Sequence, residues 1–316
     1  MNNLEPSGGR KGVLLGKLFL TAALSAVMVS QIYKTIRQYD AVKVKAKYSY
    51  LNELREHARP LDYVIDVVRS RQPFDPKALK EYIYYYSKVV EYMPTRGDAQ
   101  GMVGFFYYQA GREEEAIRAY EKAIALNPRF FWSRYNLGVI FFKQKRYEEA
   151  IARFKEAVET DPKATIEYIL ASREIYFPLT SKRVGQWTDL KEMLRAGQNN
   201  SMRGIVLSFF YLQHYQDVLD ICQYALANHF EDRDFFFYYA GVAAYGLTEY
   251  QKSIYMLQES LKGNPGHAES YRYLALALKA VGRDAMAATV MAQGAAVHQK
   301  GERPLFDEDE LRLEIF

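Results

Sequence analysis

The sequence is poor in the residues that build metal centres and covalent cross-links. Its 316 residues include one cysteine and five histidines. A single cysteine excludes an internal disulfide, an iron–sulfur cluster and a thiolate zinc site, and it leaves the redox compartment open. The histidines are scattered along the chain. We therefore expect neither a bound metal nor a cofactor.

Motifs of the common catalytic sites are also missing. The sequence contains no H-E-x-x-H, G-x-S-x-G or G-x-G-x-x-G. Residues 12–17 resemble a phosphate-binding loop, but the glycine spacing is one residue short and no Ser or Thr follows Lys17. The carboxylates at 113–115 and 148–149 stand at the start of expected helices, where the helix dipole accounts for them. We expect no enzymatic activity.

The net positive charge of the chain comes from its N-terminal segment. Residues 1–60 hold ten Lys/Arg against four Asp/Glu, whereas the whole chain has a net charge of +4. The body at 61–316 is therefore slightly acidic, which is unlike a nucleic-acid-binding surface. We expect no nucleic-acid partner.

An apolar segment at Val13–Tyr33 is long enough to cross a bilayer. Leu18–Tyr33 carries no charge, and a span of about 20 residues results if Lys17 extends toward the head groups. An uncleaved anchor is favoured because apolar residues continue through Ile32. A cleavable signal peptide with small residues around 22–26, and a buried amphipathic helix, are the alternatives.

The orientation of this segment is open from the sequence. Lys34, Arg37 and further lysines to 47 follow the span, which by the positive-inside rule would keep the body cytoplasmic. A short basic N-terminus directly before an apolar run is instead the usual export pattern. We expect an extracytoplasmic, periplasmic body by a narrow margin.

Three prolines define a repeat of 34 residues. Pro94, Pro128 and Pro162 are equally spaced, at the period of a helix–turn–helix repeat. Residues 97–130 and 131–164 share apolar, small or proline residues at offsets 7, 8, 11, 20, 24, 27 and 32, which in the second unit are Leu137, Gly138, Phe141, Ala150, Phe154, Ala157 and Pro162.

This pattern closely resembles the tetratricopeptide repeat (TPR) family. The resemblance implies an all-α fold, a superhelical solenoid of antiparallel helix pairs, with the expected N-terminal transmembrane helix in front. Gly at offset 8 and Ala at offset 20 fit a close helix crossing, and the proline ends the second helix. Cys222 falls at an apolar offset, so we expect it in the core.

The expected organisation follows from this spacing. It comprises a tail at 1–12, the anchor at 13–33, a basic juxtamembrane segment at 34–62, TPR units over 63–164 with the first degenerate, an irregular or distorted repeat at 165–198, further units over 199–300 and an acidic tail at 301–316. In the irregular part we expect a first helix ending near Pro178, a loop at 180–186, a separate helix over 188–195, and a bend or gap in the superhelix. The acidic tail is read mainly as a solvated end, and otherwise as an element that docks on a partner.

In TPR proteins, offsets 2, 5, 9, 12 and 13 of the first helices line the inner groove. Here those positions are largely aromatic, which suits protein recognition. The alternative is that the rings pack on each other, or are covered by residues 63–92 or by the C-terminal tail. The expected partner-binding residues are Phe105, Tyr108, Trp132, Tyr135, Phe142, Phe210, Tyr211, Phe235, Tyr238 and Tyr245.

One binding mode of the family is disfavoured. Members that grip chaperone C-termini place Lys, Asn and Arg at offsets 5, 6 and 9, and only Asn136 fits that pattern here. The resemblance thus implies a membrane-anchored scaffold that takes a peptide or helix of a protein partner, in assembly of a bacterial envelope complex. The alternative is a structural subunit of a large membrane complex with its aromatic face permanently covered.

Overall fold

The computed structural model describes residues 28, 30–31, 34–35, 61–171 and 187–314. The chain divides into two compact units, Met1–His57 and Ala58–Phe316. The described residues of the first unit are helical. Within them the Thr35 hydroxyl donates a hydrogen bond of 2.9 Å to the carbonyl of Gln31.

The expected membrane segment falls almost wholly outside the described residues. Of positions 13–33, only 28, 30 and 31 are described. None of the helices in the described part of the chain has the length and apolar character that a membrane crossing requires. Membrane anchoring therefore stays a prediction.

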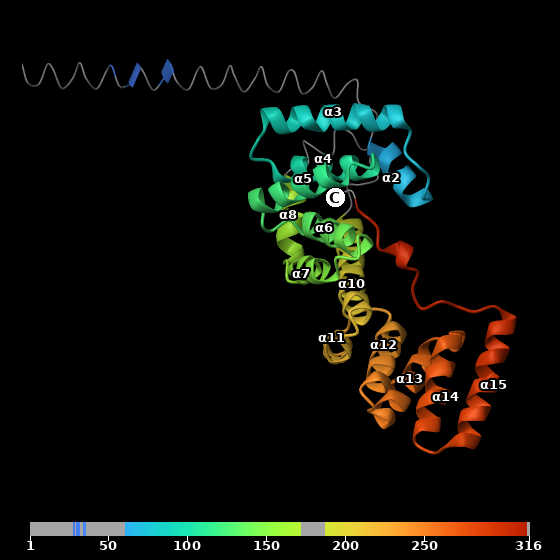
Figure 1. The fold of residues 1–316 in the computed structure, drawn as a ribbon. Coiled ribbons are helices and arrows are strands. Elements are labelled where there is room, and N and C mark those ends of the chain that lie inside the picture. The colour runs from blue at the N-terminus through green and yellow to red at the C-terminus, as the bar shows by residue number, and fades with distance from the viewer. Residues whose placement is uncertain (1–27, 29, 32–33, 36–60, 172–186, 315–316) are drawn as a thin grey trace, which may run out of the picture. The chain divides into compact units, whose positions relative to one another are not determined.

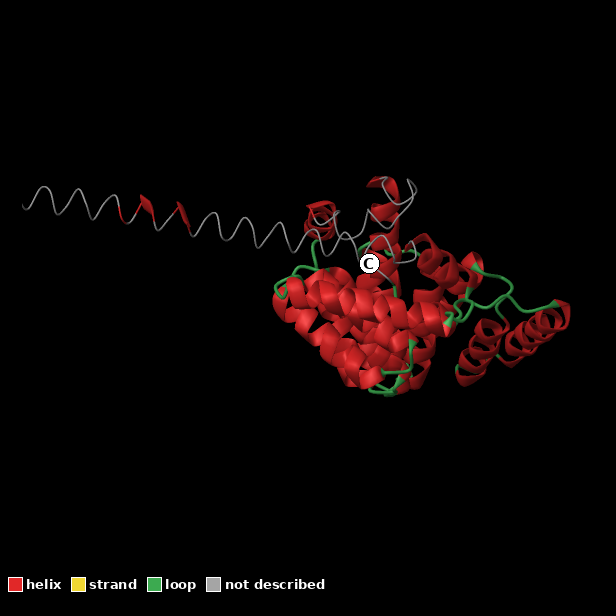
Figure 2. Cartoon of the chain, turned by 90° about the horizontal axis from the view of Figure 1, so that it is seen from above, coloured by secondary structure: helices red, strands yellow, loops and turns green. Residues whose placement is uncertain are grey.

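The second unit is built of helices, and its described part contains no strand (Figure 2). Figure 1 shows the order of these helices along the chain. Their bounds are α2 Leu61–Ser70, α3 Pro76–Tyr92, α4 Gly97–Gln109, α5 Glu113–Leu126, α6 Phe131–Lys143, α7 Tyr147–Val158, α8 Pro162–Ala171, α10 Trp187–Tyr211, α11 Tyr215–Ala227, α12 Arg233–Gly246, α13 Tyr250–Gly263, α14 Ala268–Ala280, α15 Asp284–Lys300 and the 3₁₀ turn η3 Glu308–Glu310.

Pairs of helices stack on one another along this unit. Within pairs, α4 packs on α5, α6 on α7, α12 on α13 and α14 on α15. Between pairs, α3 packs on α4, α5 on α6, α11 on α12 and α13 on α14. The pairs match the units expected at 97–130, 131–164 and 234–267, so the all-α helical repeat fold is confirmed.

The turns that join the two helices of each pair share one backbone conformation. Each has three residues, and the middle one adopts a left-handed conformation that ends the first helix. In the turn after α6, Arg146 N–H donates to the Phe141 carbonyl (2.8 Å) and Lys145 N–H to that of Phe142 (2.9 Å). The left-handed residues, with φ between 59° and 77°, are Gly111, Lys145, Gln213, Thr248 and Gly282.

The glycine at offset 8 is required by the ring or side chain at offset 24. A Cβ on Gly138 would lie 2.8 Å from the ring of Phe154, and one on Gly241 would lie 2.6 Å from Leu257. These distances are shorter than carbon atoms tolerate. Gly138 therefore brings α6 and α7 close enough to bury Phe154 completely.

The irregular segment differs from its prediction. We expected a separate helix over 188–195, but α10 continues from Trp187 to Tyr211 without a break. It packs directly on α7 and α6. Gly197 and Gly204 permit this approach, because a Cβ on them would lie 2.7 Å from Phe131 and 2.4 Å from Phe154. The stack therefore passes from α7 to α10 without the expected gap; residues 172–186 lie outside the described residues.

Cys222 lies in the core, as its offset predicted. Its side chain is fully buried in α11, and this burial raises the pKa of the thiol well above its usual value. A protonated, inaccessible thiol is a packing residue rather than a reactive one.

The contact between Gly138 and Phe154 can be tested by double mutation. We expect Gly138→Ala to lower the free energy of unfolding by about 1–3 kcal/mol, because the added methyl group overpacks the helix crossing. In a Phe154→Leu background the same change should cost clearly less. Thermal or urea unfolding followed by circular dichroism measures both costs, and equal costs in the two backgrounds would contradict the contact.

Candidate functional site

The C-terminal segment, residues 301–314, lies against the first helices of the repeats. It leaves α15 at Gly301, whose φ of 103° is accessible to glycine. Figure 1 shows it, in red, returning along the solenoid toward α6. Its contacts fall on α6, α10, α12 and the turn before α14. We call this surface the inner wall.

The far end of the segment is held through its backbone. The side-chain amide of Asn136 donates to the carbonyl of Glu314 (2.6 Å), and the N–H of Glu314 donates to the Asn136 Oδ1 (2.8 Å). Asn136 also donates to the Tyr120 hydroxyl (3.1 Å) of the preceding unit. Asn136 is 2% exposed, so its amide is fixed in place. It binds the backbone of Glu314 rather than its side chain.

The near end of the segment is held in the same way. The N–H of Arg303 donates to the Gly266 carbonyl (2.9 Å), and the Asn264 side-chain amide donates to the Arg303 carbonyl (3.1 Å). Asn264 is itself fixed, because its Oδ1 accepts from Gly266 N–H at 3.1 Å. Two asparagine side chains thus clamp the two ends of the segment, and the turn η3 lies between them.

Apolar side chains anchor the stretch between the clamps. Leu311 is fully buried and Leu313 is 3% exposed. Phe306 packs edge-on against Phe235 of α12, with ring centroids 5.7 Å apart, and lies 4.7 Å from the guanidinium of Arg203. Burying a leucine is worth about 1.5–3 kcal/mol, so the two leucines are the strongest attachment of the segment.

The acidic run 307–310 faces basic and hydroxyl groups. Asp307 lies 3.6 Å from Arg71, and the Tyr211 hydroxyl donates to Glu308. Burial lowers the pKa of Arg203, and the charge of Glu310 counteracts this. The Arg71–Asp307 pair is exposed and contributes about 0–1 kcal/mol. These charged contacts therefore contribute more to the orientation of the segment than to its binding energy.

A cavity of about 380 Å³ lies beside the segment. Its walls combine apolar groups with charged ones from both sides. The lining residues are Val67, Val68, Arg71, Gln72, Phe74, Tyr108, Gln109, Lys143, Asp309, Arg312 and Leu313. The inner wall thus keeps open space next to its present occupant.

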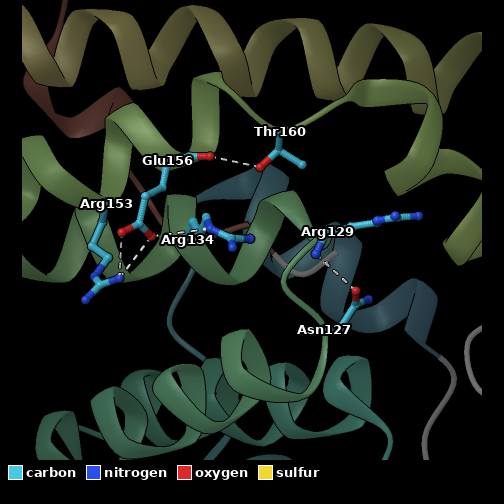
Figure 3. A network of polar contacts seen from close by, with 6 residues as sticks. All are labelled: Asn127, Arg129, Arg134, Arg153, Glu156 and Thr160. Atoms are coloured by element: carbon cyan, nitrogen blue, oxygen red, sulfur yellow. Dashed lines mark hydrogen bonds and ion pairs between the residues drawn. The ribbon is translucent and has the colours of Figure 1, made fainter.

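A second cavity, of about 550 Å³, lies by the loops 127–130 and 159–161. Figure 3 shows its polar network, in which Glu156 accepts from Arg153 (2.9 Å) and lies 3.3 Å from Arg134. Thr160 donates to the Glu156 carbonyl at 2.9 Å. Glu159 and Asp161 also line the cavity, so acidic groups offset its arginines and it has no single charge to select a ligand.

The described residues also lack a metal centre: none of their His, Cys, Asp and Glu side chains gather in groups of three or more that could hold an ion.

Comparison with known families matches two stretches of the chain. Residues 106–145 match a TPR repeat model, and residues 131–164 match the tetratricopeptide repeat model. These are the units in which offsets 8 and 24 pack together. Residues 106–164 of the chain therefore carry tetratricopeptide repeats. TPR scaffolds are typically not enzymes, and the fold implies binding of proteins or peptides.

Solved TPR structures resemble this chain at low sequence identity. A MamA crystal structure has a TM-score of 0.50 and 18% identity, covering 66% of this chain and 94% of that one. YrrB, described as a TPR protein with an unusual peptide-binding site, gives 0.49 and 13%, covering 68% and 92%. Pseudomonas aeruginosa PilF gives 0.49 and 15%, covering 79% and 95%. The search of curated proteins gives no match.

The ten aromatic residues predicted for the TPR groove are less open than expected. Tyr211 is exposed, at 43%. The half-buried ones are Tyr108, Phe210, Tyr238 and Tyr245. The buried ones are Phe105, Trp132, Tyr135, Phe142 and Phe235.

Contacts among rings and with other segments account for this burial. Phe105 packs on Phe74, with centroids 6.1 Å apart, and Phe235 lies under Phe306 of the C-terminal segment. Tyr211 stacks on Tyr147 at 5.2 Å. These contacts agree with the alternative in which rings cover each other or lie beneath 63–92 and the tail. Partner binding by the ten residues stays a prediction.

The reading of the tail as mainly a solvated end is wrong for its last described residues. The acidic run is exposed, but Leu311 and Leu313 are buried. In the sequence, Asn136 stood out only as the one match to the residues with which other TPR proteins bind chaperone C-termini. Asn264 and Arg203 were not predicted as binding residues. The alternation of leucines with charged residues at 311–314 was the available signal, since it is typical of a chain with one buried side.

Proposed function

We propose that this protein is a membrane-anchored, non-enzymatic TPR scaffold that binds an extended segment of a partner protein on its inner wall. The proposal rests on the pair of hydrogen bonds between the Asn136 side chain and the backbone of Glu314. An asparagine amide that satisfies both backbone groups of one residue accepts any extended chain. The inner wall is thus built to receive polypeptide.

The surface next to this clamp supports the same function. Tyr211 offers an exposed ring, and the cavity of about 380 Å³ that Tyr108 and Leu313 help to line leaves room for further side chains. Aromatic residues dominate the energy of protein interfaces because they contribute a large contact area at low entropic cost. The predicted groove residues that keep some exposure are the ones we assign to partner contact.

The membrane role rests on the N-terminal sequence. Residues 13–33 have the length and apolarity of a bilayer span. A tethered scaffold meets membrane-bound partners at a raised effective concentration, so modest affinity suffices. We propose that the repeats are periplasmic and serve the assembly of a bacterial envelope complex.

A second candidate is a structural subunit whose aromatic face is permanently covered. This candidate is favoured by the packing of the C-terminal segment over Phe235. Purified alone in detergent, the full chain should then aggregate, because its remaining contacts would be missing. A scaffold that recruits partners should instead be monodisperse.

Replacing Tyr211 tests the partner surface. We expect Tyr211→Ala to weaken capture of the partner by the full chain at least tenfold, since loss of a central interface aromatic costs about 2 kcal/mol. Tyr255→Ala is the matched control, because Tyr255 is equally large and is 56% exposed on α13. Quantitative mass spectrometry of cross-linked complexes gives the measurement. Equal recovery with both variants would contradict the proposed surface.

Membrane topology is tested by reporter fusion. A periplasm-active reporter fused after Phe316 should be active, and a cytoplasm-active one silent. Protease added outside the inner membrane should digest the repeats. The reverse pattern would place the repeats in the cytoplasm and refute the periplasmic assignment.

A further inference from the structure

The C-terminal segment occupies the inner wall as a ligand would. Its backbone is clamped at Arg303 and Glu314, and its side chains fill apolar sites between the clamps. The bonded residues Asn136 and Glu314 are 178 positions apart in the sequence. The contact is therefore tertiary and does not follow from local chain geometry.

We call the part of the inner wall that holds the C-terminal segment the seat. The burial and charge of its contacts define which peptide it can bind. Leu311 and Leu313 are buried, whereas the residues beside them, Arg312 and Glu314, are only half-buried. Alternate burial is the mark of an extended chain with one face on a surface. The seat thus takes two apolar side chains on alternate residues.

A second feature of the seat is its charge. Arg71 lies 3.6 Å from Asp307 and Lys143 lines the same cavity as Asp309, whereas Arg203 is ion-paired with Asp232 and lies over the ring of Phe306. Arg71 and Lys143 come from separate parts of the chain and lie beside one acidic run. Complementary charge of this kind selects a partner and its direction more than it adds affinity.

We propose that residues 302–314 act as a built-in competitor, and that the partner carries a segment of the same kind: an acidic run followed by two apolar side chains on alternate residues. This inference rests on the proposed function and names its partner chemistry. The partner gains the inner wall only by displacing the chain's own segment.

The tether makes this competition strong. About ten residues separate Gly301 from Leu311, and a short linker gives an effective concentration on the order of millimolar. A free segment of equal intrinsic affinity is therefore excluded at micromolar concentration. Weakening the segment's own anchors opens the site without altering the wall.

The test uses the full chain in detergent and a fluorescein-labelled peptide with the sequence of residues 302–316. Leu311→Asp combined with Leu313→Asp removes the two apolar anchors. We expect the peptide to bind this double variant at least tenfold more tightly than the wild type, by fluorescence anisotropy. A peptide carrying the same two aspartates should bind neither protein.

Two further variants locate the binding. In the double-variant background, Asn136→Ala should abolish peptide binding, whereas Tyr120→Phe should preserve it, because it removes only the other partner of the asparagine. Circular dichroism verifies that all variants keep their helicity. If the double variant loses helicity, millimolar peptide added to the wild type should increase proteolysis of its own segment.

The other outcomes overturn the inference. Equal binding to wild type and double variant means that the segment does not compete. Absence of binding to both refutes the partner chemistry, while the Tyr211→Ala comparison still tests partner capture independently. Concentration-dependent dimerisation of the wild type, lost in the double variant, means that the segment belongs to the wall of a second copy.

Discussion

The architecture depends on one buried ring and the two glycines that flank it. Phe154 of α7 is fully buried, and an added Cβ on either Gly138 of α6 or Gly204 of α10 would collide with it. Three helices from two parts of the chain therefore meet at a single side chain. This contact sets α10 directly on the preceding pair and positions Arg203 and Tyr211, which face the C-terminal segment.

The aromatic surface of the inner wall is partly covered by the chain's own C-terminal segment. Large exposed apolar patches on a protein mark interaction sites or cause aggregation. Here rings such as Phe235 are covered by the chain's own C-terminal segment, which is held by backbone clamps and two leucines. In the proposed competition, this cover protects the surface until a partner segment displaces it.

The local parts of this arrangement were predictable, and the long-range parts were not. The equal spacing of the prolines predicts the length of one unit, and the Gly138 and Phe154 offsets predict the helix pair, since both lie within a single unit. The continuity of α10 was not predicted, because it depends on the close approach of Gly197 to Phe131, a contact between distant parts of the chain. The seat of the C-terminal segment joins residues 178 positions apart, a pairing that a 34-residue period does not encode. The sequence left open whether the aromatic positions are free or are covered by residues 63–92 and the C-terminal tail, and their role in partner binding stays a prediction.

Hydrogen–deuterium exchange of the C-terminal segment in the full chain, at low protein concentration, tests the account most directly. The peptide containing Leu311–Glu314 should be protected in the wild type. It should exchange at least tenfold faster in Asn136→Ala and remain protected in Tyr120→Phe, which leaves the Glu314 clamp intact. Rapid exchange in the wild type, or equal protection in all three proteins, would show that the segment is not seated on the inner wall through Asn136.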